Sequence, residues 1–66
     1  MKTKRIKASL LRNNDRIVDC GKVCTVTDFK MVLREDIVTY NLADSDDVIT
    51  GRWAGMDSIV DKVVDA

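Results

Sequence analysis

Apolar and polar residues alternate along much of this chain, which is the pattern of β-strands rather than of helices. Residues 23–29 are rich in β-branched side chains, and from Phe29 to Arg34 every second residue is large and apolar. Residues 37–42 and 48–53 have a similar strand-forming composition. The pattern therefore predicts several short strands and no long helix.

Short polar or glycine-containing stretches separate these strands. Asn13-Asn14-Asp15 suits backbone positions with positive φ, because short polar side chains tolerate the left-handed region. Gly21 has the same freedom and can close a hairpin between its flanking strands. Glu35-Asp36 and Ala43–Asp47 indicate further turns. Gly51, inside a strand, indicates a bulge or a close approach of the backbone.

The two ends of the chain have patterns of their own. Residues 1–7 are mostly basic and offer only Ile6 for burial, so we expect a partly frayed segment. Ala8–Leu11 is too short for an amphipathic helix and predicts a single helical or 3₁₀ turn. In residues 58–64 the apolar spacing fits a helix, whereas three valines and one isoleucine favour a strand. We predict a closing strand there.

Four or five short strands without proline point to a small all-β barrel, because closure removes the open edges that a small sheet would expose. One core is expected, formed by apolar residues from several of these strands. They are Ile17, Val18, Val23, Val26, Phe29, Ile37, Leu42 and Ile49.

Length and charge limit the possible functions. Sixty-six residues allow one domain. Residues 1–16 carry six cations and one anion, and residues 17–66 carry five cations and ten anions, so the neutral chain is electrically polar. The absence of a long apolar run or a signal-peptide pattern, together with only two cysteines, predicts no membrane span and a reducing, cytoplasmic location.

The run Leu10–Val18, followed by Gly21-Lys22-Val23 and Thr25-Val26, resembles the opening of SH3-like barrels of the KOW type. It is similar to the N-terminal domain of elongation factor P, and the pattern also resembles small bacteriophage proteins of unassigned role. The resemblance implies an SH3-like barrel of about five strands over residues 8–66. The translation factor's modified lysine has no counterpart around Arg34-Glu35-Asp36, so its ribosomal activity is not transferred.

The sequence does not support catalysis or a bound cofactor. Histidine is absent, and only nearby Lys22 would lower the pKa of the possible nucleophiles Cys20 and Cys24. The acidic run that begins at Asp44 lacks the glycine and glutamate of a calcium loop. We therefore predict no enzyme, no metal and no cofactor.

Binding to a protein or nucleoprotein partner is the leading hypothesis. Tryptophan and arginine are enriched at interaction hot spots, although the sole tryptophan, Trp53, could equally be a core residue. Tyr40 has the same two alternatives. The partner-binding candidates are Trp53, Arg52, Tyr40, Asp44, Asp46 and Asp47.

Nucleic-acid binding is the alternative hypothesis. It would use cations of the N-terminal segment as phosphate contacts, with Lys30 and Arg34 able to join them. No base-reading pattern accompanies them. The candidates are Lys2, Lys4, Arg5, Lys7, Arg12 and Arg16.

Overall fold

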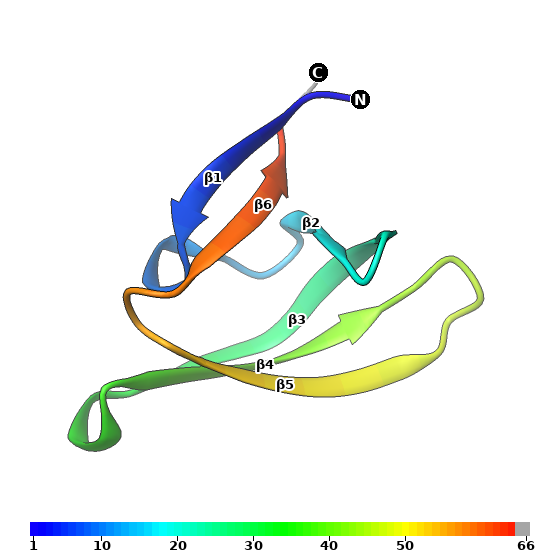
Figure 1. The fold of residues 1–66 in the computed structure, drawn as a ribbon. Helices are drawn as coiled ribbons and strands as arrows, with labels where there is room; N and C mark the ends of the chain where they lie inside the picture. The colour runs from blue at the N-terminus through cyan, green and yellow to red at the C-terminus, as the bar shows by residue number, and fades with distance from the viewer. Residues whose placement is uncertain (65–66) are drawn as a thin grey trace.

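A computed structural model describes residues 1–64. Within this range the chain forms one antiparallel sheet with two 3₁₀ turns, η1 (Ala8–Leu10) and η2 (Leu33–Glu35). The strands follow the order β1-β6-β2-β3-β4-β5 across the sheet (Figure 1). Their bounds are β1 Thr3–Lys7, β2 Arg16–Asp19, β3 Lys22–Val32, β4 Ile37–Ala43, β5 Ile49–Gly55 and β6 Ile59–Val63.

The all-β class is confirmed, with one strand more than expected in the described range. The single helical or 3₁₀ turn predicted at Ala8–Leu11 is a 3₁₀ turn over Ala8–Leu10, and the predicted closing strand is present as β6. The basic segment, for which we expected partial fraying, contains β1, which pairs with β6 from Thr3 to Lys7. Backbone pairing ends at β1 on one side and at β5 on the other, so the sheet has two edges and is not closed.

The hairpin predicted around Gly21 joins β2 to β3. Asp19 pairs with Lys22, which leaves Cys20 and Gly21 as the loop. Both have positive φ, at 50° and 78°, the combination that a type I′ turn requires. This turn matches the twist of the flanking strands and sets their register, with Ile17 opposite Cys24.

The asparagine turn ahead of β2 also has the predicted geometry. Asn14 has a φ of 76°, and its amide donates to the Val26 carbonyl at 2.8 Å. The Arg12 amide donates to the Asp15 carboxylate at 2.9 Å, which closes the turn. Asn13 accepts a hydrogen bond from the Phe29 amide. The turn is therefore fastened to β3 at both Val26 and Phe29.

A bulge lies in β3 and not at Gly51, where the sequence suggested one. The β3–β4 register shifts between Thr27 and Lys30, and Asp28 has a φ of 51°. Gly51 instead pairs with Asn41 in an unbroken β4–β5 ladder. The bulge bends β3, so this long strand can follow the curvature of the sheet.

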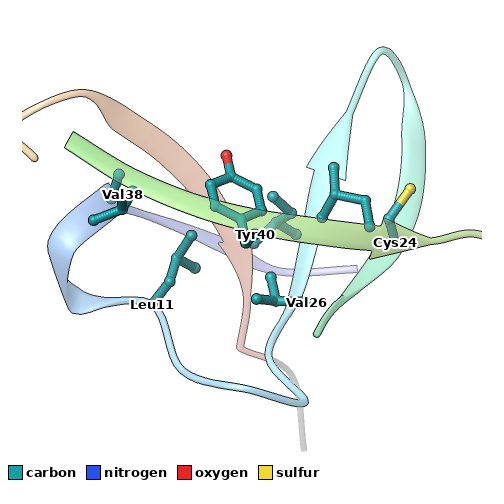
Figure 2. Close-up of a cluster of buried hydrophobic side chains, with 8 residues drawn as sticks. Leu11, Cys24, Val26, Val38 and Tyr40 are labelled. Carbon is teal, nitrogen blue, oxygen red and sulfur yellow. The ribbon is translucent and has the colours of Figure 1, made fainter. Parts of the chain in front are cut away.

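One hydrophobic cluster is built on one face of the curved sheet, the inner face (Figure 2). Val38 and Tyr40 extend from one face of β4 towards this cluster, with the Tyr40 hydroxyl directed away from Leu11 and Val26. Turn η1 lies against β4 and β5, and the Ser9 amide donates to the Met56 carbonyl. The buried members are Ala8, Leu11, Ile17, Cys24, Val26, Val38, Tyr40 and Leu42.

The predicted core is only partly correct. Ile17, Val26 and Leu42 are buried, and Phe29 is half-buried against the cluster. Val23 and Ile49 are exposed.

Strand alternation explains the misplaced core residues. Val18 follows buried Ile17, and Ile37 precedes buried Val38, so each lies on the opposite face of its strand and is half-buried. Adjacent residues of a regular strand cannot both face one core.

Candidate interaction surface

Trp53 lies on the outer face of the sheet, on edge strand β5. Its side chain is 71% exposed, the largest exposed aromatic surface among the described residues. Thr39 on β4 lies opposite Trp53, and Lys30 on β3 lies opposite Thr39. Lys30, Thr39 and Trp53 therefore form one row across three strands. Trp53 is an interface candidate and not a core residue.

A second row runs beside the first. Asn41 pairs with Gly51, and the Asn41 side-chain amide donates to the Asp28 carboxylate at 3.1 Å. Because Gly51 has no side chain, it leaves a depression in the sheet surface between Trp53 and Asn41.

The two rows border an open hollow of about 540 Å³. It combines an aromatic ring, a cation, a carboxylate and side-chain amide and hydroxyl groups, which is suited to a mixed polar and apolar partner. Its lining residues are Asp28, Lys30, Thr39, Tyr40, Asn41, Gly51, Arg52 and Trp53.

Arg52 and Tyr40 also border the hollow, but their side chains interact on the other face of the sheet. The Tyr40 side chain is in the buried cluster, on the opposite face of the sheet from Trp53. The Arg52 guanidinium donates to the Asp19 carboxylate of β2 at 3.0 Å. This hydrogen bond, followed by the charge of Asp19, raises the pKa of Arg52. Two of the predicted binding residues therefore have structural partners of their own.

The same ion pair influences the buried titratable side chains below it. Burial raises the pKa of Tyr40, with a further contribution from the charge of Asp19. Burial likewise raises the pKa of Cys24, followed by the charges of Asp19 and Asp44. A raised pKa keeps the Cys24 thiol neutral, which opposes its use as a nucleophile.

A smaller cavity of about 170 Å³ lies beside this ion pair. Cys20, which is exposed, and Cys24, which is buried, both line it as free thiols. Within residues 1–64, no three cysteine, aspartate or glutamate side chains gather as metal ligands would.

The predicted acidic residues occupy the β4–β5 loop, where their roles differ. The Asp44 carboxylate accepts hydrogen bonds from the amides of Asp46, at 2.8 Å, and Val48, at 3.0 Å. Asp47 has a φ of 60° and donates its amide to the Asp44 carbonyl. Asp44 is thus a loop-stabilising residue, while Asp46 and Asp47 are exposed.

The six basic candidates are all exposed, but acidic residues lie among them. Lys7 forms an ion pair with Asp57 at 3.5 Å, and Arg5 lies opposite Asp61 in the β1–β6 ladder. Arg12 donates to the Leu11 carbonyl at 2.8 Å. Because β1 is a strand, its cations also alternate between two faces. The N-terminal cations are therefore divided between two faces of β1 and interspersed with acidic residues.

The hollow contains residues that the sequence analysis did not select. Thr39 and Asn41 are polar residues at alternate positions of an otherwise apolar strand, a pattern that marks them as outward-facing. Asp28 could not be found in this way, because its position depends on the bulge.

No family model, curated protein or solved structure matches this chain. Among residues 1–64, the structure contains no helix with the length and apolar character needed to cross a membrane.

Proposed function

We propose that this protein is a small non-catalytic binding module that docks on a protein or nucleoprotein partner through the surface around Trp53. The observation that carries the proposal is the exposed tryptophan beside a polar hollow. Tryptophan is among the residues enriched at binding hot spots, and a hollow beside it offers a place for a partner to dock.

An SH3-like barrel is the architecture that we propose for this module. Strands β2, β3, β4 and β5 are consecutive neighbours, and β6 returns to lie beside β2. The Arg52–Asp19 ion pair joins β5 to β2, as expected if the sheet curls towards closure. Turn η1 and β1 would then be additions to the five-stranded unit. This arrangement supports the resemblance seen in the N-terminal sequence.

Trp53 fluorescence provides a direct test, because Trp53 is the only tryptophan in the chain. A partner isolated from the source cell should shift the emission of Trp53 to shorter wavelength as it covers the ring. Trp53→Ala should weaken binding of that purified partner by about 2 kcal/mol or more. Leu33→Ala is the matched control, because Leu33 is exposed to a similar extent but lies on η2. Equal binding by both variants would place the docking surface elsewhere.

Nucleic-acid binding through the N-terminal segment is the alternative function. The exposure of all its cations is the observation in its favour. Binding of the unmodified protein to random DNA or RNA should then depend steeply on salt. Changing Lys2, Lys4, Arg5 and Lys7 together to glutamine should abolish that binding. Unchanged binding by this variant would exclude the segment as the nucleic-acid site.

A further inference from the structure

The two edges of the sheet differ in how well they are protected against pairing with another strand. Edge strand β1 carries Lys4, Arg5 and Lys7, and charged side chains are a common protection of open edges. Edge strand β5 has seven residues, contains neither lysine nor proline, and pairs with β4 without a bulge. Its single charge, Arg52, is held by Asp19. Strand β5 is therefore the less protected of the two edges, although the Arg52 guanidinium also donates to the Gly51 carbonyl at 3.3 Å.

The outer face of β5 has a self-complementary pattern. Ile49, Gly51 and Trp53 alternate with Thr50 and Arg52, which belong to the inner face. Ile49 is 57% exposed, and Gly51 and Trp53 are exposed as well. In an antiparallel pair related by a two-fold axis at Gly51, each isoleucine lies opposite the tryptophan of the other copy. Pairs of an aromatic and a β-branched residue are favourable in antiparallel sheets.

We propose that two copies of this chain associate through antiparallel pairing of their β5 strands, centred on Gly51. In this register Gly51 lies opposite Gly51, Ile49 opposite Trp53, and Thr50 opposite Arg52 of the second copy. The contact is self-complementary, as two-fold dimers require, and the two sheets become one continuous sheet. The inference does not rest on the proposed docking function.

Charge selects this register over its neighbours. A shift of the axis to Arg52 places two arginines directly opposite each other, and a shift to Thr50 places Trp53 opposite Asp47. Pairing of β5 with β1 of another copy would be head-to-tail and would continue into rings or filaments. The register centred on Gly51 closes as a dimer and has no like charges opposite each other.

The dimer would place both hollows on the same outer face, on either side of the two-fold axis. Each hollow includes Gly51 and Trp53, which lie at the contact. A partner with two linked binding segments could then occupy both hollows, with a gain in apparent affinity from the linkage.

A charge placed at the two-fold axis gives a specific test. A Cβ added at Gly51 would meet only the Asn41 side-chain oxygen at 3.7 Å, an ordinary contact, so the monomer can accept a substitution there. Gly51→Lys or Gly51→Asp would put two like charges opposite each other in the dimer. An equimolar mixture of the two variants would instead bring opposite charges together.

Sedimentation equilibrium of the purified protein, from about 1 µM to about 1 mM, measures the association. The unmodified chain and Gly51→Ala should approach twice the 7.4 kDa monomer mass as concentration rises. Each charged variant should have a dimer dissociation constant at least about tenfold higher than that of the unmodified chain. The mixture of the two variants should recover the dimer. A monomer throughout this range would overturn the proposal. So would charged variants that associate like the unmodified chain, or a mixture that fails to recover, provided that circular dichroism shows each variant folded.

Discussion

Arg52 on β5 and Asp19 on β2 form an ion pair at 3.0 Å, although β3 and β4 separate these strands in the sheet. Residues from non-adjacent strands can meet in this way only if the sheet curls back on itself. The pair lies on the face that also carries Tyr40 and Cys24, whose pKa values both respond to Asp19. The curl of the sheet therefore brings the Asp19 charge close enough to raise the pKa values of Tyr40 and Cys24.

The pH dependence of Tyr40 tests this link. Burial raises the pKa of Tyr40, followed by the charge of Asp19, so ionisation is harder in the folded state than in the unfolded state. The folded state then holds the phenolic proton more tightly, so the contribution of Tyr40 to stability is constant below about pH 10 and falls as pH rises through the raised pKa. Absorbance of tyrosinate can follow this titration cleanly, because Tyr40 is the only tyrosine.

Asp19→Asn should lower the pKa of Tyr40, since it removes the carboxylate and leaves the Arg52 charge in place. Tyr40→Phe is the control, and it should abolish the fall in melting temperature assigned to this group. An unchanged tyrosine titration in Asp19→Asn would contradict the proximity of the two side chains.

Core substitutions test the burial pattern of the strands. Leu42→Ala should destabilise the fold by about 2–5 kcal/mol, because Leu42 is only 2% exposed and its loss leaves a cavity. Ile49→Ala should change the stability of the monomer by about 0.5 kcal/mol or less, because Ile49 is already exposed. Phe29→Ala should fall between these values, since Phe29 is half-buried. Urea unfolding at low protein concentration measures all three, and equal losses at Leu42 and Ile49 would be inconsistent with the structure.

The β4–β5 loop provides a third prediction. Asp44→Ala removes the acceptor of two amide hydrogen bonds and should cost about 1–2 kcal/mol of stability. Asp46→Ala is the matched control and should have an effect near zero, because Asp46 is exposed and contributes its amide, which alanine retains. Thermal unfolding of both variants at one pH distinguishes this structural role of Asp44 from a purely surface role.

The two cysteines should differ in reactivity. Cys20 is exposed at the β2–β3 turn, whereas Cys24 is buried and has a raised pKa. A thiol reagent at neutral pH should therefore label one site in the folded protein and two sites in denaturant, as read by mass spectrometry. Replacing both by serine or alanine should preserve the fold, with a modest loss at the buried position. Rapid labelling of Cys24 in the folded state would show that its surroundings are open.

The sequence by itself determined the local features of this protein. Asn14 and Gly21 have the positive φ values that their residue types favour, and β-branched content correctly indicated strand β6. These features depend on a few neighbouring residues, whose steric preferences act over short distances. Strand alternation is such a local rule too, and it already excludes Ile17 and Val18 from facing the same core.

Tertiary structure decided which face of each strand is buried and which residues meet. The sequence left open whether Tyr40 and Trp53 are core or surface residues, and only the pairing and curl of the strands place Tyr40 inside and Trp53 outside. The bulge at Asp28 and the Arg52–Asp19 pair both depend on strands brought together from distant parts of the chain. Their positions follow from the packing of the whole sheet, which no short stretch of the sequence encodes.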